Sequence, residues 1–206
     1  QKELDRKKKI IAPFFTPFIS PLIPSIFKVA GYEMETLPIS DECSCDWGLK
    51  YSNNEVCYPA TLIVGDIVKA FKEGRYDPDN TCVAITQTGG QCRASNYISL
   101  IKKALVDAGY TDVPVISVSL GSGIDNQQPG FKVNWLKVLP IALAAVLYSD
   151  CIAKFYYAAV VREKKPGQAA KLKDMYLEAA KPLILKNRPE DLLSYLSLAV
   201  DEFNQI

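Results

Sequence analysis

Short apolar runs of strand length alternate with segments of helical periodicity along the first 130 residues of the chain. The expected strands are residues 9–15, 32–37, 81–86 and 113–118, and the helices between them are residues 20–30, 59–73 and 92–108. Strands that alternate with helices are typical of right-handed βαβ units with parallel strands. The sequence therefore predicts a three-layer α/β fold, with a mostly parallel four-stranded sheet of the Rossmann or flavodoxin type.

The last third of the chain has no strand pattern. Three helical segments are expected there, at residues 131–161 with a kink at Pro140, at 168–185 and at 190–203. We therefore expect three parts: a linker at residues 1–8, an α/β lobe at 9–130, and an all-helical region at 131–206. The helical region would pack on the lobe or on a neighbouring domain.

The composition of the chain argues against several classes of function. Lysine and arginine number 24 against 23 aspartate and glutamate residues, so no electrostatic footprint for nucleic acid or an anionic membrane is present. The longest apolar stretch, residues 138–148, is about half of the roughly 20 residues that cross a bilayer, and no membrane span is expected. Histidine is absent, which removes the commonest general base and metal ligand.

The expected compartment decides how the six cysteines are interpreted. The sequence begins with Gln1 and shows neither an initiator methionine nor a signal peptide, so we expect an excerpt of a longer cytoplasmic protein. In the cytoplasm cysteines are more often reduced, buried or metal-bound than paired as disulfides.

Four of the cysteines are expected at one edge of the sheet. Residues 38–58 lack periodicity and hold Cys43, Cys45 and Cys57 in a loop after the second strand, while Cys92 follows the third strand. Loops at the carboxyl ends of parallel strands share an edge, where ligands bind in open α/β sheets. Cys57 and Cys92 also stand where helices are expected to begin, which stabilises a thiolate.

Other interpretations of the cysteines stay open. They can be small core residues, which is the expectation for Cys82 and Cys151. Zinc competes with an iron–sulfur cluster, although structural zinc usually uses C-x-x-C pairs and this chain has only the C-x-C of Cys43 and Cys45. A lone catalytic thiol is disfavoured, because acidic neighbours oppose thiolate formation and no base is available.

Two glycine loops suggest phosphate binding. Gly89 and Gly90 precede an expected helix and can offer backbone N–H groups to an anion, and Gly121 and Gly123 follow a strand. Neither loop matches a Walker A or dinucleotide fingerprint, and a sharp turn is the alternative. Arg93 would serve an anionic ligand or cover the cysteine loop.

Two segments resemble a known family. Residues 55–65 read EVCYPATLIVG and resemble the V-C-Y-P-A-K-x-x-x-G segment of large proteins related to 2-hydroxyacyl-CoA dehydratases and their ATP-dependent activases. Residues 86–97, which contain GGQCR, are similar to the G-P-C-R-x-G-x-Y segment of the same group. The chain departs from these patterns at Gln91, where the family has proline, and at Thr61, where it has lysine.

The resemblance implies an iron–sulfur module of an anaerobic multidomain protein, in which ATP hydrolysis drives a low-potential electron to a cluster for radical dehydration of an acyl-CoA. Cys57 and Cys92 would be ligands of a 4Fe–4S cluster, with Cys45 or else Cys43 as the third. The implied partners are activase-type ATPase domains of the same polypeptide and acyl-CoA. The rival hypothesis is a non-catalytic interaction or scaffolding domain.

Overall fold

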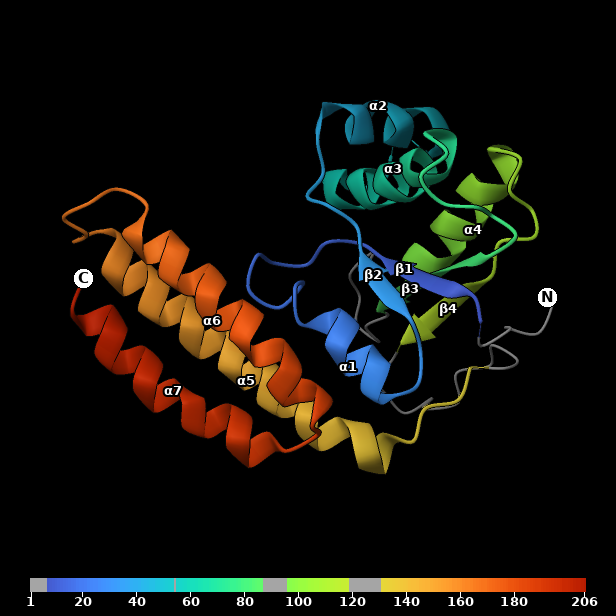
Figure 1. The fold of residues 1–206 in the computed structure, drawn as a ribbon. Coiled ribbons are helices and arrows are strands. Elements are labelled where there is room, and N and C mark those ends of the chain that lie inside the picture. Colours follow the sequence, from blue (N-terminus) through green and yellow to red (C-terminus); the bar gives the residue numbers. More distant parts are fainter. Residues whose placement is uncertain (1–6, 54, 87–95, 119–130) are drawn as a thin grey trace. The chain divides into compact units, whose positions relative to one another are not determined.

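The computed structural model describes residues 7–53, 55–86, 96–118 and 131–206 (Figure 1). The chain forms two compact units. The α/β unit comprises residues 1–14 and 33–132, and the helical unit comprises residues 15–32 and 133–206.

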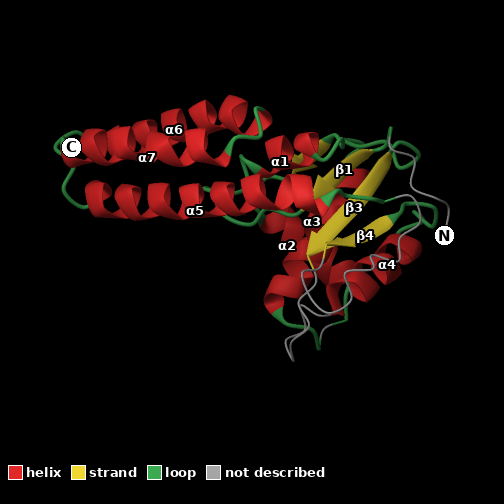
Figure 2. Ribbon diagram, turned by 90° about the horizontal axis from the view of Figure 1, so that it is seen from below, coloured by secondary structure: helices red, strands yellow, loops and turns green. Residues whose placement is uncertain are grey.

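The described part of the α/β unit contains four strands, all parallel. They are β1 (Lys9–Ala12), β2 (Met34–Thr36), β3 (Thr81–Thr86) and β4 (Val115–Val118), in the spatial order β2-β1-β3-β4. Ile10 pairs with Met34 on one side and with Cys82 on the other, and Val83 pairs with Val115. Figure 2 shows β1, β3 and β4 side by side. The expected class, an α/β fold with a parallel four-stranded sheet and a helical C-terminal region, is confirmed.

Helices α3 (Tyr58–Lys72) and α4 (Tyr97–Asp107) share one hydrophobic core with the sheet. Alternate strand residues contribute to it because successive side chains of a strand point to opposite faces. The main contributors are Ile11, Val83, Ile85 and Val115 from the strands, and Val64, Ile67, Val68, Phe71, Ile101, Ala104 and Leu105 from the helices. Both helices therefore cover the same face of the sheet.

The segment at residues 38–58 is not the loop that the sequence predicted. Helix α2 (Glu42–Tyr51) occupies its centre. A capping box starts this helix: the Ser44 N–H donates to Asp41 Oδ1 at 2.9 Å, and the Asp41 N–H donates to Ser44 Oγ at 3.2 Å. Cys43 and Cys45 thus lie in the first turns of a helix, and the expectation of a cysteine-bearing loop was wrong for these two residues.

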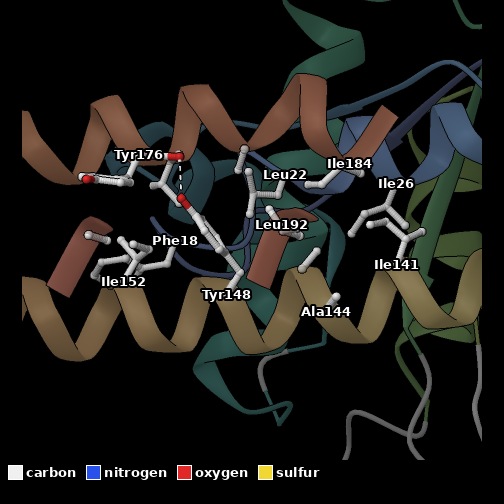
Figure 3. Close-up of a cluster of buried hydrophobic side chains, with 14 of the residues drawn as sticks. Phe18, Leu22, Ile26, Ile141, Ala144, Tyr148, Ile152, Tyr176, Ile184 and Leu192 are labelled. Carbon is white, nitrogen blue, oxygen red and sulfur yellow. Dashed lines mark hydrogen bonds between the residues drawn. The ribbon is translucent and has the colours of Figure 1, made fainter. Parts of the chain in front are cut away.

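The helical unit contains α1 (Ile23–Val29), α5 (Trp135–Val160), α6 (Gln168–Leu185) and α7 (Pro189–Asn204). Their buried side chains form one cluster, part of which is drawn in Figure 3. Tyr148 lies at its centre and donates a hydrogen bond of 3.0 Å to the backbone oxygen of Tyr176. Large apolar side chains from all four helices therefore hold this unit together.

Residues 15–32 belong to the helical unit, whereas the sequence division placed them in the α/β lobe. The reason is hydrophobic burial: Phe18, Leu22 and Ile26 pack in the same cluster as residues of α5, α6 and α7. The chain thus leaves the α/β unit after β1 and returns to it before β2.

The bounds of β3 and α6 match the sequence prediction, and those of α3 and α7 differ from it by one residue at each end. β1, β2 and β4 are shorter than expected, and α5 is helical through Pro140. α4 is described from Tyr97, so the expectation that a helix begins at Cys92 falls outside the described residues.

α5 is long and apolar enough to cross a membrane by length and composition alone. Of its most apolar 18-residue window, 39% is buried in the structure. Its buried residues, Ile141, Tyr148 and Ile152 among them, join the core of the helical unit. The core helix of a helical bundle has the same length and composition, so the feature alone does not indicate a membrane segment.

Candidate functional site

Helices α2 and α3 lie with their backbones in direct contact. A Cβ atom added to Gly65 of α3 would lie 1.7 Å from the backbone oxygen of Ser44 in α2. A Cβ atom added to Gly48 of α2 would lie 2.1 Å from the backbone oxygen of Thr61 in α3. Only residues without a side chain fit at these two positions, so the two glycines set the position of α2 on α3.

A buried carboxylate lies beside this contact. Asp66, which is 8% exposed, follows Gly65 and accepts a hydrogen bond of 2.6 Å from the Ser40 hydroxyl. Burial raises the pKa of Asp66, while hydrogen bonds from Ser40 and Ser44 oppose that rise. Asp66 therefore ties the segment before α2 to α3.

A second polar anchor lies at the surface. The Lys69 ammonium of α3 donates to the Asp41 carboxylate, which caps α2. The hydrogen bond from Lys69, followed by that from the Ser44 N–H, lowers the pKa of Asp41 to about 2. Next to this pair is a small hollow of about 50 Å³, whose charged lining residues are Asp66, Lys69, Glu73 and Arg75. Charges of both signs balance there, which indicates a structural network rather than a site for one kind of ion.

Cys57 stands at the start of α3. It is the N-cap residue, its side chain is exposed, and it makes no side-chain capping bond to the first turn. Its Sγ atom lies 4.0 Å from the hydroxyl oxygen of Tyr97, the first residue of α4. The starts of α3 and α4 therefore meet, although 40 residues separate the two side chains in the sequence.

Cys45 approaches the same helix start from α2. Its side chain is half-buried and lies close to the Tyr58 hydroxyl. Hydrogen bonding to Cys45, with the negative charge of a Cys45 thiolate, raises the pKa of Tyr58. Since Tyr58 directly follows Cys57, the two thiols flank one tyrosine at the beginning of α3.

Cys43 belongs to a different part of the α2 surface. It is exposed and lies two residues before Cys45, which places it about 200° around the helix. The charge of a Cys43 thiolate contributes, as the smallest of several causes, to the raised pKa of Lys69, eleven residues beyond Tyr58 along α3. The C-x-C pair therefore does not present both thiols to one site.

Of the remaining described cysteines, Cys82 lies in a core as expected, whereas Cys151, for which a core position was also expected, is only partly buried. Cys82 is fully buried in β3, and burial raises the pKa of its thiol to about 12. Cys151 lies in α5. Neither lies at the start of α3 or α4.

Several predicted site residues fall outside the described ranges. These are Cys92, Gly89, Gly90 and Arg93, together with Gly121 and Gly123. Within residues 7–53, 55–86, 96–118 and 131–206, no three histidine, cysteine, aspartate or glutamate side chains form a group that could hold a metal ion. The described residues thus supply two of the three predicted thiol ligands.

Sequence reasoning missed the α2–α3 contact and its polar anchors. The spacing of Asp41 and Ser44 is a helix-start signal, and it would have placed α2. Gly65 stands inside a helical pattern, where a glycine often has a packing reason. The burial of Asp66 has no comparable local signal, because it depends on α2 folding over α3.

No family model, curated protein or solved structure matched the chain.

Proposed function

We propose that this chain is an iron–sulfur module related to 2-hydroxyacyl-CoA dehydratases, which takes part in ATP-coupled, low-potential electron transfer. Cys57, Cys92 and Cys45 would hold the cluster, a 4Fe–4S cluster. The observation that carries the proposal is the contact between Cys57 and Tyr97 at the joined starts of α3 and α4. Tyr97 follows Cys92 by five residues, and five extended residues span at most about 18 Å.

The donor chemistry at Cys57 fits a cluster ligand. Thiolate sulfur is the usual protein ligand of iron–sulfur clusters. The first turn of the 15-residue helix α3 has no side-chain cap, so its backbone N–H groups and the helix dipole favour a negative sulfur at the N-cap. The exposed side chain also leaves room for a bulky ligand.

The neighbouring residues would hold and tune the centre. The Tyr97 hydroxyl can donate to a Cys57 thiolate, and the half-buried Cys45 beside Tyr58 would close the other side. The bound cluster would supply one-electron storage at low potential. Activase-type ATPase domains and acyl-CoA are the proposed partners, and Gly89, Gly90 and Arg93 are the residues proposed to bind an anionic group of the latter.

Anaerobic reconstitution tests this proposal. The chain is incubated with ferrous iron, sulfide and a thiol reductant, desalted, and analysed for iron and acid-labile sulfide. About four irons and four sulfides per chain are expected, with the brown absorbance of a cluster. A colourless protein that retains no iron after desalting would contradict the proposal.

A non-catalytic interaction domain is the second candidate. The observation that favours it is the apolar exposed surface of α5, where Leu136 is 92% exposed and Leu143 is 59% exposed. An interaction domain would bind no iron in the experiment above. Replacement of Cys57 by serine would then leave its iron content and absorbance unchanged.

A further inference from the structure

The outer face of α5 is apolar along its first half. Five large aliphatic residues, which we call the α5 stripe, lie exposed on it: Leu136 (92%), Leu139 (38%), Leu143 (59%), Val146 (47%) and Leu147 (57%). Further along the same face the exposed residues are charged, Asp150 and Lys154, as is usual for a surface in contact with solvent.

The stripe is separate from the core of the helical unit. α5 buries its other face through residues that include Val138, Ile141, Ala145 and Tyr148. The core of the unit is therefore complete without the stripe. An apolar face that the unit itself does not use indicates an interaction surface.

The spacing of the stripe is suited to pairing with another helix. Successive residues are three, four and three positions apart, which is the a/d spacing of the seam of a two-stranded coiled coil: Leu136, Leu139, Leu143 and Val146. A stripe of this kind is self-complementary, as a twofold dimer requires. We propose that the α5 stripe pairs with the α5 stripe of a second copy of this chain, in antiparallel orientation.

The available area is sufficient for such a dimer. Five aliphatic side chains with these exposures present on the order of 500 Å² per copy, the size of the largest apolar patch on a typical monomer, which is often functional. Two copies would bury at most about 1,000 Å², the lower limit for a specific interface. The dimer is therefore expected to be weak.

The charges at the ends of the stripe select the orientation. Asp150 occupies the next seam position after Val146, so a parallel pair would bring two Asp150 carboxylates face to face. In an antiparallel pair Leu136 faces Val146 of the partner subunit, and Leu139 faces Leu143 of the partner subunit. Asp150 then lies beyond the apolar layers, at the end of the partner helix that carries Lys137.

Analytical ultracentrifugation of the chain from about 1 to 500 μM tests the pairing. The weight-average mass should rise from 22.8 kDa toward twice that value. Leu143→Glu should weaken the dimer at least about tenfold, because it places two carboxylates at the centre of the seam. The matched control is Leu198→Glu on α7, which is 53% exposed and outside the stripe, and it should leave dimerisation unchanged.

Several outcomes would overturn the proposal. A wild-type chain that stays monomeric at 500 μM would do so, as would a dimer that survives Leu143→Glu or is lost equally in Leu198→Glu. Circular dichroism establishes that both variants keep their helices, and Leu143→Gln replaces the glutamate variant if it unfolds. Flotation of monomeric wild-type protein with phosphatidylcholine vesicles, abolished by Leu143→Glu, would assign the stripe to a lipid surface instead.

One more variant tests the orientation. Asp150→Ala removes the charge that a parallel pair would bring together. In the antiparallel pair this change should alter the dissociation constant less than about threefold. A tightening of tenfold or more would indicate a parallel dimer and contradict the arrangement proposed here.

Discussion

Helices pack against one another differently in the α2–α3 pair and in the helical unit. α2 and α3 touch through backbone, because Gly48 and Gly65 carry no side chains. In the helical unit, by contrast, Tyr148, Tyr176 and Phe203 are almost fully buried and fill the space between helices. The α2–α3 interface therefore depends on the absence of side chains at two glycines, whereas the helical unit depends on large side chains that fill its core.

This difference determines what each region tolerates. A core of interlocking side chains accepts changes that keep its volume, since neighbouring side chains can repack. A backbone contact cannot adjust in this way, so a single added methyl group must move a whole helix. The less tolerant interface is the one that brings Cys45 of α2 to the start of α3.

The largest effect is expected where the helical unit loses volume. Ile152→Ala removes three carbons from a residue with no exposed surface and should lower the free energy of unfolding by about 4 kcal/mol. Ile152→Leu keeps the volume and should cost less than about 1.5 kcal/mol. Urea denaturation measures both values, and equal losses would show that this core does not repack.

The addition of a single methyl group at Gly65 should disrupt the α2–α3 contact. Gly65→Ala places a methyl group against the Ser44 carbonyl and should cost about 3 kcal/mol, with faster hydrogen exchange throughout α2. Gly31→Ala is the control: Gly31 has a φ of +86° and open space around it, so only about 1 kcal/mol of backbone strain is expected. A cost for Gly65→Ala no larger than for Gly31→Ala would contradict the close contact.

The Tyr148 hydroxyl in the core of the helical unit should contribute less to stability than the buried apolar side chains. Tyr148→Phe keeps the ring and removes the hydrogen bond to the Tyr176 oxygen, at a cost of about 1 kcal/mol. Thermal unfolding of the variant beside Ile152→Ala provides the measurement. A loss as large as that of Ile152→Ala would mean that the hydrogen bond, not filled volume, holds this unit.

The smallest expected effect is a pH dependence that arises in the α/β unit. Burial alone would raise the pKa of Glu35, but hydrogen bonds from Lys9 and Tyr76 outweigh it and lower the pKa from 4.5 to about 2. This lowered pKa stabilises the fold above pH 4.5, and the stabilisation is lost as the pH falls toward 2. Because Glu35 is partly exposed, the contribution is about 1 kcal/mol or less.

Glu35→Gln should abolish this part of the acid sensitivity, and Tyr76→Phe should reduce it partially, since one hydrogen bond is lost. The free energy of unfolding measured between pH 6 and pH 2.5 tests both variants. A wild-type and Glu35→Gln difference that does not shrink on acidification would be inconsistent with the lowered pKa of Glu35.

The sequence predicted the sheet well because its signals are local. The apolar run at residues 81–86 and the proline and glycine around residues 59–73 determine where β3 and α3 begin and end. α2 was missed because its ten residues have little apolar periodicity, and its helix-start signal is confined to the capping box at Asp41 and Ser44. The placement of residues 15–32 depends on long-range burial of Phe18 and Leu22, which no local pattern reveals.

The candidate site was predictable only in part. The position of Cys57 at a helix start follows from Pro59, which favours the first helical turn. The separation of Cys43 from Cys45 could not be predicted while the segment was regarded as a loop. Residues two positions apart can point to one side in a loop, but they lie on opposite sides of a helix. The contact with Tyr97 depends on the sheet order that joins the two helix starts.

Iron content of matched cysteine variants tests the central claim most directly. Cys43 and Cys45 lie on the same helix, but only Cys45 approaches the start of α3. After anaerobic reconstitution, Cys43→Ser should retain about four irons per chain, like the wild type. Cys45→Ser should lose a large part of that iron, and Cys57→Ser should lose nearly all of it. Equal iron in the Cys43→Ser and Cys57→Ser proteins would contradict the account.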